Sequence, residues 1–158
     1  MRICLRRREF IAGLGGAAVW PLSAHAQRGN RLRRIGVLMP GDENDPERKL
    51  RLSAFTQALA NLGWTDGRNV RIDLRWYGDD SNRARALAQE LVGLQPDIIL
   101  TIGVPATAAV QRETRTIPIV FATVGDPVAQ RIVARLNQPG GNITGFALYE
   151  PTLPGKWA

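Results

Sequence analysis

Three short segments of small and polar residues follow apolar runs, and they are the positions in this sequence best suited to bind a ligand. They contain Pro40, Gly41 and Asp42; Gly103, Val104, Pro105, Ala106 and Thr107; and Thr123, Val124, Gly125 and Asp126. Small side chains leave backbone N–H groups within reach of a ligand. Where such a segment opens a helix, the free N–H groups and the helix dipole favour an anion such as a carboxylate. We therefore predict noncovalent ligand binding at these residues.

Each residue also has a simpler structural explanation when it is taken alone. Gly103 and Pro105 would shape a turn between a strand and a helix, and Asp126 would cap a helix that begins at Pro127. For any single position this structural explanation is preferred. Three such segments at one edge of the sheet predicted below favour a binding cleft.

Side chains that commonly carry catalysis are missing from most of the sequence. The single cysteine, Cys4, and the single histidine, His25, both lie in the first 26 residues. The remainder therefore has no Cys nucleophile, no His base and no Cys/His metal set. We expect no catalytic residue, no metal site and no cofactor. The alternative is a small exported flavodoxin-like α/β enzyme, whose acid–base chemistry would depend on isolated carboxylates such as Asp42 and Asp126.

The first 26 residues have the features of an export signal. A basic segment precedes an apolar run that is too short to span a bilayer, and a small-x-small cleavage pattern follows. The residues that carry these features are Arg7, Arg8, Phe10, Ala24 and Ala26. The two arginines before an aromatic residue resemble a twin-arginine motif. We expect export by the Tat machinery, with the Sec route as the alternative, cleavage after Ala26, and a mature protein in the periplasm.

Much of the positive charge belongs to this export signal. The formal net charge of the whole sequence is +7, from 21 basic and 14 acidic residues. Residues 1–26 hold four arginines and one acid, which leaves 17 basic against 13 acidic residues. The only dense basic group after the signal, Arg28, Arg31, Arg33 and Arg34, lies in the predicted tail between the cleavage site and the first strand, and residues 27–32 are predicted to be flexible. Without a basic patch on a folded face, binding to nucleic acid is not expected.

Five segments are predicted to be β-strands, and their patterns indicate where each lies in a sheet. Residues 35–39, 97–102 and 117–122 are continuous apolar runs, which suit strands buried on both faces. Residues 69–77 alternate apolar and polar side chains, which indicates one solvated face. Residues 143–146 form the fifth strand. The strand order 2-1-3-4-5 places the continuous strands centrally and the alternating strand at an edge.

Helical patterns lie between these strands. Asp45 and Pro46 provide an N-cap and a first-turn proline for a helix that ends before Gly63. Ser81 can cap a second helix, and a third spans about residues 105–115. The inward positions are Leu52, Phe55, Leu59 and Leu62 in the first helix and Ala84, Leu87, Ala88 and Leu91 in the second. This alternation predicts an α/β fold with a parallel, doubly wound sheet. Ligands of such sheets bind beyond the carboxyl ends of the strands, where the three candidate segments fall.

Several of these segments also carry a family resemblance. In their order and spacing, residues 96–99 with 103–107, 117–121, 125–128 and 139–145 resemble the ABC-transporter substrate-binding proteins that include the tryptophan- and tyrosine-associated members. The resemblance implies a type I periplasmic binding protein fold, in which two α/β lobes close on a small solute, such as an amino acid. It also implies delivery of that solute to the membrane subunits of an ABC permease, without any reaction. The ligand contacts carried over by matching positions are residues 103–107 and 123–126.

The resemblance covers only part of a two-lobed protein. Residues 33–148 correspond to the N-terminal lobe, and residues 149–158 resemble the start of the crossover that leads to the second lobe. We expect the chain to be a truncated form, with a single-lobe binding module as the alternative. One lobe makes contacts from one side only and does not exclude water from the ligand. Residues 27–158 alone are therefore expected not to bind a solute tightly.

Overall fold

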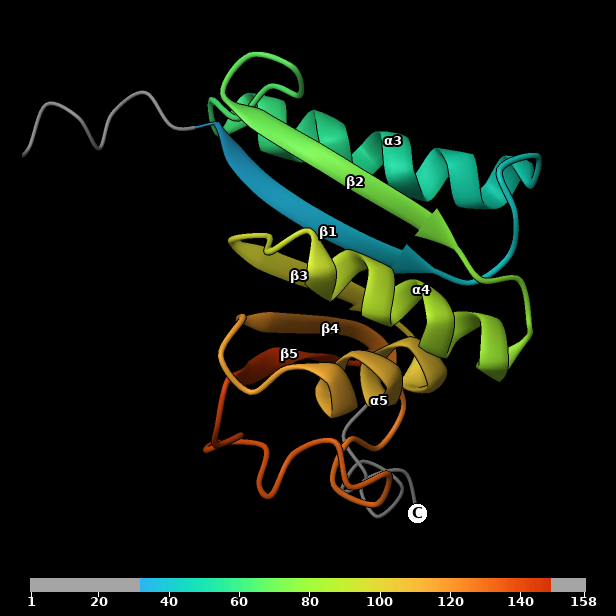
Figure 1. The fold of residues 1–158 in the computed structure, drawn as a ribbon, viewed down its shortest axis with the longest axis vertical. Helices are drawn as coiled ribbons and strands as arrows, with labels where there is room; N and C mark the ends of the chain where they lie inside the picture. The colour runs from blue at the N-terminus through green and yellow to red at the C-terminus, as the bar shows by residue number, and fades with distance from the viewer. Residues whose placement is uncertain (1–31, 149–158) are drawn as a thin grey trace, which may run out of the picture. The chain divides into compact units, whose positions relative to one another are not determined.

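The computed structural model describes residues 32–148, which form a five-stranded sheet (Figure 1). The strands are β1 (Arg33–Met39), β2 (Val70–Trp76), β3 (Ile98–Ile102), β4 (Ile119–Val124) and β5 (Ile143–Ala147). All neighbouring strands are parallel, and their order is β2-β1-β3-β4-β5. The predicted fold class and strand order are therefore confirmed. β1 pairs with β2 on one side and with β3 on the other. The strands that follow β2 are therefore added on the opposite side of β1, which is the point where the strand order reverses.

Helices cover the two faces of the sheet unequally. The helices are α3 (Pro46–Asn61), α4 (Ser81–Gly93) and α5 (Val104–Glu113). Figure 1 views the sheet from the side of α4 and α5, while α3 lies behind β1 and β2. Parallel sheets are normally covered on both faces because βαβ crossovers place helices there. Within the described residues, one face carries two helices and the other face carries one.

The caps of the first two helices differ in how well the sequence predicts them. Asp45 caps α3 as predicted, since its Oδ1 accepts hydrogen bonds from the backbone N–H groups of Glu47 and Arg48 at 2.9 and 3.3 Å. The prediction of Ser81 as the cap of α4 is wrong. Asp80 caps that helix and accepts from Asn82 N at 2.7 Å. Asp80 has the extended backbone that an N-cap needs, whereas Ser81 is already the first helical residue.

The helix expected to begin at Pro127 is not found in the described residues. Asp126 does accept hydrogen bonds from the N–H groups of Val128 and Ala129, at 3.0 and 2.9 Å, as an N-cap would. The following residues form turns, and Arg131 takes a φ of 56°. A left-handed residue at this point interrupts the helical repeat after one turn. Asp126 therefore stabilises a turn and not the start of a helix.

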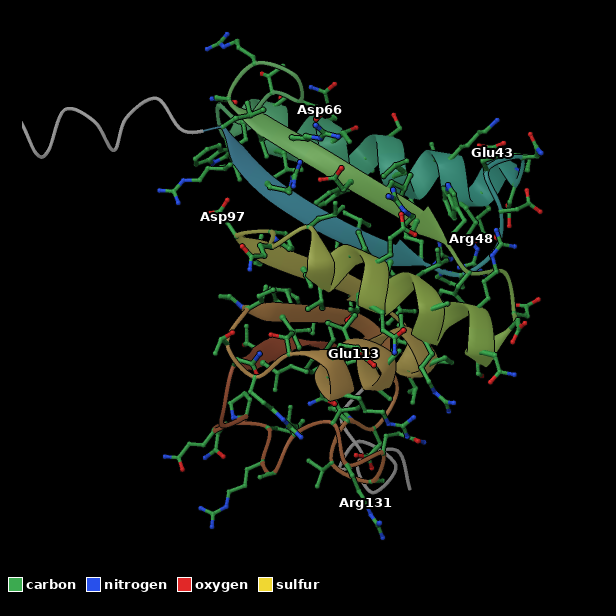
Figure 2. The ribbon with its side chains drawn as sticks, in the orientation of Figure 1. Glu43, Arg48, Asp66, Asp97, Glu113 and Arg131 are labelled. Carbon is green, nitrogen blue, oxygen red and sulfur yellow. The ribbon has the colours of Figure 1, made fainter. Side chains whose placement is uncertain are left out.

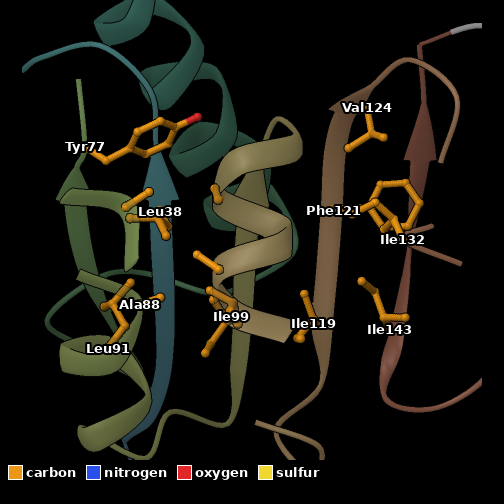
Figure 3. Packing of buried hydrophobic residues seen from close by; sticks show 14 of the residues in the cluster. Leu38, Tyr77, Ala88, Leu91, Ile99, Ile119, Phe121, Val124, Ile132 and Ile143 are labelled. Atoms are coloured by element: carbon orange, nitrogen blue, oxygen red, sulfur yellow. The ribbon is translucent and has the colours of Figure 1, made fainter. Parts of the chain in front are cut away.

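Apolar side chains gather between the sheet and the α4–α5 layer (Figure 3). The buried members of this cluster are Leu38, Tyr77, Ala84, Ala88, Leu91, Ile99, Ala106, Ala109, Val110, Ile119, Phe121, Val124, Ile132, Val133 and Ile143. Three further buried hydrophobic residues, Val37, Met39 and Val70, lie outside it. On α3, no residue is buried, and Leu62, predicted to face the sheet, is 76% exposed because it is the C-cap of that helix.

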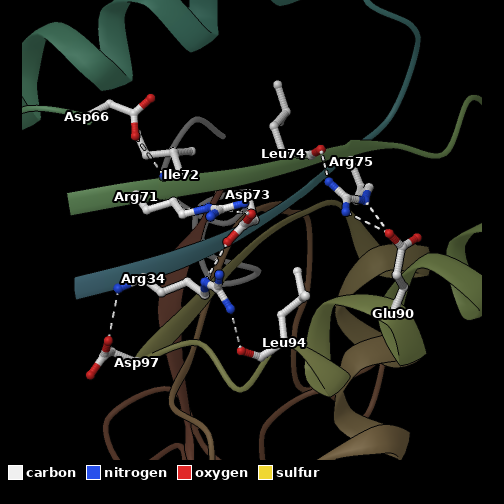
Figure 4. Close-up of polar contacts among 10 residues, drawn as sticks. All are labelled: Arg34, Asp66, Arg71, Ile72, Asp73, Leu74, Arg75, Glu90, Leu94 and Asp97. Atoms are coloured by element: carbon white, nitrogen blue, oxygen red, sulfur yellow. Dashed lines mark hydrogen bonds and ion pairs between the residues drawn. The ribbon is translucent and has the colours of Figure 1, made fainter. Parts of the chain in front are cut away.

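The polar side of β2 is less solvated than its alternating pattern predicts (Figure 4). Asp73 is only 7% exposed, and its carboxylate pairs with the Nε atoms of Arg34 at 2.9 Å and Arg71 at 3.2 Å. Arg34 also donates to the carbonyl of Leu94 at 2.8 Å. Arg33 and Arg34 were predicted to lie in the tail, but both belong to β1, and Arg34 pairs with a buried carboxylate.

Some predictions fall outside the described residues. They are the export signal over residues 1–26, nearly all of the tail over residues 27–32, and the crossover segment over residues 149–158. Within residues 32–148, no helix is both long enough and apolar enough to cross a membrane.

Candidate functional site

The three predicted segments all follow strands at the carboxyl edge of the sheet. Residues 40–42 follow β1, residues 103–107 begin at the end of β3, and residues 123–126 overlap the end of β4. Since β3 lies between β1 and β4 and all three run in the same direction, these segments meet at one edge. The structure therefore brings together the segments that were singled out from the sequence.

The segment after β3 is fixed from inside the protein. Gly103 has a φ of 84° and is the N-cap of α5, with no side-chain hydrogen bond to the first turn. The hydroxyls of Thr101 and Thr107 lie 2.9 Å apart, and the Thr107 hydroxyl also donates to Gly103 O at 2.7 Å. The side chains of Ala106 and Thr107 are fully buried, so they cannot touch a solute. The accessible part of this segment is the turn at Gly103, Val104 and Pro105.

The end of β4 has an irregular backbone. Its pairing with β5 shifts register between Ala122 and Val124, and Thr123 between them has a φ of 62°. A left-handed conformation is unusual for a β-branched residue, and such conformations are frequent at functional sites. Thr123 lines a cavity of about 160 Å³ beneath α3, together with Arg51 among others. The side chain of Val124 is fully buried, and Asp126 caps the turn that follows.

The segment after β1 is joined to the loop after β2. Gly41 and Gly78 exchange two backbone hydrogen bonds, each of 3.0 Å. Gly41 has a φ of 78°, and an added Cβ there would lie 3.3 Å from Cγ of Arg48. Asp42 is exposed and accepts from Asn44 N at 2.7 Å. The Gly41 turn is thus fixed by backbone hydrogen bonds with Gly78, and the Arg48 side chain packs against it.

Tyr77 was predicted to lie on the solvated face of the alternating strand over residues 69–77 and not in the site, and this prediction is wrong, because it is buried and connects two of the predicted segments. It is 3% exposed and donates through its backbone N–H to Met39 O at 3.0 Å. Its hydroxyl donates to Ile102 O at 3.3 Å and lies 3.5 Å from the position that a Cβ on Gly103 would take. Burial raises the pKa of the Tyr77 phenol. Its place directly after the strand beside β1 is the sequence signal that could have found it.

Arg48 is a second residue that was not predicted from the sequence. It lies in the first turn of α3, and Figure 2 shows it at the end of the sheet where β1 and β2 finish, opposite the end that carries Asp66 and Asp97. Among the described residues, no group of Asp, Glu, His or Cys could hold a metal ion. The position that a Cβ on Gly41 would take lies 3.4 Å from Arg48 Nε and 3.6 Å from Asp45 Oδ2, so a cation and a carboxylate both border this turn.

Comparison with known families identifies the group of proteins to which this architecture belongs. The profile described as "ABC transporter substrate binding protein" matches residues 37–152, which is more than half of the chain. The chain belongs to this family. The resemblance seen in the segments at the ends of β3 and β4 is thereby confirmed, and the match extends over residues 37–152.

Proteins that are similar in sequence or structure include two whose names give an amino-acid ligand. The tyrosine-binding protein of Clostridioides difficile (strain R20291) is 35% identical over 95 residues, which cover 60% of this chain. A structure from Streptococcus pneumonia in complex with L-Trp has a TM-score of 0.66 at 28% identity, over 74% of this chain. A conserved domain protein from Vibrio cholerae has a TM-score of 0.69 at 30% identity, over 77% of this chain.

This chain spans only part of the length of those proteins. The match covers 28% of the tyrosine-binding protein, 39% of the L-Trp complex and 40% of the Vibrio cholerae protein. The coverage fits one α/β lobe of a longer protein, and the TM-scores show that the fold of this lobe is shared with the two structural neighbours.

Proposed function

We propose that this protein binds a small solute, of the amino-acid class, at the carboxyl edge of its sheet, and presents that solute to the membrane subunits of an ABC importer. The observation that carries the proposal is the family match over residues 37–152, within which the three segments predicted to contact the ligand meet at one edge. Amino-acid binding is supported by the names of two similar proteins, a tyrosine-binding protein and an L-Trp complex. The solute is bound and released without chemical change.

The contacts in this proposal come from the accessible parts of the three segments. Gly103, Val104 and Pro105 present backbone groups at the start of α5, whose dipole favours the carboxylate of an amino acid. Thr123 contributes from the irregular end of β4, and the Gly41 turn contributes from β1. A second lobe, where one is present, would close over this edge and exclude water, which would strengthen each polar contact.

Binding is tested by NMR titration of the whole chain with the common amino acids, with L-tyrosine and L-tryptophan first. We expect millimolar affinity, because only one side of the solute is contacted, and shifts confined to residues near 40–42, 103–105 and 123–126. If no amino acid changes the spectrum, the proposed function is wrong. Low-micromolar binding would instead contradict the expectation that one lobe binds weakly.

A matched pair of glycine variants separates binding from stability in this test. Gly103 and Gly63 both have a positive φ, of 84° and 88°, so Gly→Ala strains the backbone at each. Gly63 follows α3, and nothing lies within 4 Å of the Cβ it lacks. We expect Gly103→Ala to weaken solute binding while Gly63→Ala costs only stability. Equal binding by both variants would remove the start of α5 from the site.

We further propose that the protein is exported through the Tat machinery and acts in the periplasm. The support is the Arg7-Arg8-x-Phe10 pattern and the Ala24-x-Ala26 cleavage pattern. Replacing Arg7 and Arg8 together by Lys should keep the protein in the cytoplasm and leave the signal uncleaved. Continued export of the Lys variant in fractionated cells would point to the Sec route.

A further inference from the structure

Arg48 has an unusual environment for a surface arginine. Its Nε is shielded from solvent and, among the described residues, has no hydrogen-bond partner. The ion pair from Nε to Asp45 Oδ2 spans 3.5 Å, beyond the range of a good N–H···O hydrogen bond. The other oxygen of Asp45 already accepts from two backbone N–H groups at the start of α3. The Arg48 side chain as a whole is 27% exposed, and this long ion pair to Asp45 is the polar contact left to its shielded Nε among the described residues.

The position of Arg48 places this positive charge at the carboxyl edge of the sheet. Its Cγ and Nε lie 3.3 and 3.4 Å from the position that a Cβ on Gly41 would take, and Asp45 Oδ2 lies 3.6 Å from the same position. The charge of Arg48 also reaches the Tyr77 phenol and opposes the rise in pKa that burial causes. Tyr77 in turn touches the start of α5 through Ile102 O. Arg48 therefore lies at the turn after β1, and Tyr77 links that end of β1 to the end of β3.

A second arginine of α3 lies one turn further along the same helix. Arg51 lines the cavity of about 160 Å³ between α3 and the sheet, which Thr123 also lines. Its only ion pair among the described residues joins it to Glu47 at 2.5 Å, with side chains 50% and 67% exposed. Exposed pairs of this kind contribute little to stability, so the guanidinium can change partner at low cost.

We propose that Arg48, assisted by Arg51, recognises an anionic group of the solute, so that the site selects carboxylate-bearing solutes over their uncharged analogues. This inference rests on the proposed function and specifies the class of solute that the same edge binds. Arginine suits the role because its planar guanidinium forms two parallel hydrogen bonds with a carboxylate.

The test compares each amino acid with its C-terminal amide, since the amide keeps the side chain and the amino group but removes the negative charge. L-tryptophan with L-tryptophanamide, and L-tyrosine with L-tyrosinamide, are titrated into the whole chain and followed by NMR. We expect the acid to bind at least about tenfold more tightly than the amide, as one charge-assisted contact would give. In Arg48→Gln this ratio should fall close to one.

Two further variants make the ratio specific to the site. Arg85→Gln removes the same charge from an exposed position of α4 and should leave the acid-to-amide ratio unchanged. Arg48→Lys keeps the charge without the planar fork, so it should retain part of the preference. Because the ratio is measured within each variant, a general loss of stability does not alter it. Should Arg48→Gln fail to fold, Arg51→Gln and Arg48→Lys provide the same comparison.

The outcomes distinguish this inference from the proposed function. Equal binding of acid and amide by the unmodified chain, or an unchanged ratio in Arg48→Gln, overturns the recognition of an anion while solute binding stands. If none of the amino acids or amides binds, the proposed function and this inference both fall. A ratio that depends on Arg48 and not on Arg85 supports both.

Discussion

The two faces of the sheet differ in how closely helices pack against them. On the α4–α5 face, small residues such as Ala84, Ala88 and Ala106 are fully buried and allow the helices to approach the strands. On the α3 face, no helical residue is buried, and two cavities of about 340 and 160 Å³ lie between helix and strands. Close packing makes one face rigid, and loose packing leaves the other with lower local stability.

This difference divides the candidate site between a fixed part and an adaptable part. The turn at Gly103 is held by the buried Thr101 and Thr107 hydroxyls of the closely packed face. Arg48 and Arg51 come from α3, whose own contacts with the sheet are few. Rigid elements position ligand groups precisely, whereas a loosely packed helix can adjust its side chains to an arriving solute.

The largest effect that tests this comparison comes from removing a leucine on each face. Leu91 is fully buried under α4, whereas Leu52 of α3 is half-buried and already lines a cavity. We expect Leu91→Ala to lower the free energy of unfolding by about 3 kcal/mol and Leu52→Ala by about 1 kcal/mol. Urea unfolding followed by circular dichroism measures both. Equal losses would mean that the two faces contribute alike to stability.

The contrast between the faces could not have been predicted from the sequence. Leu52, Phe55 and Leu59 form an apolar stripe on α3 with the same spacing as the stripe on α4, and the pattern records which side faces inward. How closely a helix approaches the sheet depends on the side chains of both partners at every contact. The parallel sheet and its strand order depend on long apolar runs, and for that reason they were predicted correctly.

The two unpredicted site residues were missed for a related reason. Tyr77 follows an edge strand that was given no part in the site, and it reaches Ile102 only because β2, β1 and β3 are neighbours. Arg48 lies on an amphipathic helix, where a charged residue is usually solvated. Both contacts depend on side chains crossing between strands or layers, which sequence periodicity does not report. The sites predicted correctly to lie together are those defined by strand ends alone.

Adding volume to each face should have opposite effects. Ile98 and Ile99 are adjacent in β3 and point to opposite faces: Ile98 lines the cavity of about 340 Å³, and Ile99 is fully buried in the apolar cluster. We expect Ile99→Phe to cost about 2 kcal/mol, because a close-packed core cannot accept the ring. Ile98→Phe should be neutral or stabilise by up to about 1 kcal/mol by filling space. Thermal unfolding compares the two, and a large loss from Ile98→Phe would contradict loose packing beneath α3.

The buried Tyr77 gives the closely packed face a dependence on alkaline pH. Burial raises its pKa in the folded protein, so the stability that this neutral phenol contributes is complete below the ordinary phenol pKa of about 10. It is lost as the pH rises through the folded-state pKa. We expect Tyr77→Phe to cost about 1 kcal/mol or less at neutral pH, and to lose stability less steeply than the unmodified chain above about pH 10.

Urea unfolding at several alkaline pH values checks this expectation. Lysines and the other titrating groups contribute equally to both proteins, so the difference between them isolates Tyr77. Parallel pH profiles would mean that the phenol is not buried against Ile102. In that case the close packing of the α4–α5 face would not extend to the carboxyl edge of the sheet.

The smallest effect is expected from the ion pair that joins β2 to α4 at the edge of the closely packed face. Arg75 of β2 donates to Glu90 of α4 at 2.6 and 3.0 Å, with side chains 30% and 50% exposed (Figure 4). The hydrogen bond from Arg75 lowers the pKa of Glu90, so its contribution is present above the ordinary carboxyl pKa of about 4.3 and lost as the pH falls through the lowered value. Exposure to solvent keeps the effect small. We expect Glu90→Gln to cost about 0.5 kcal/mol at low salt and nothing near 1 M salt, with Glu43→Gln as the unpaired control. A loss that persists in high salt would mean that packing of the Glu90 side chain, and not its charge, joins α4 to the edge strand.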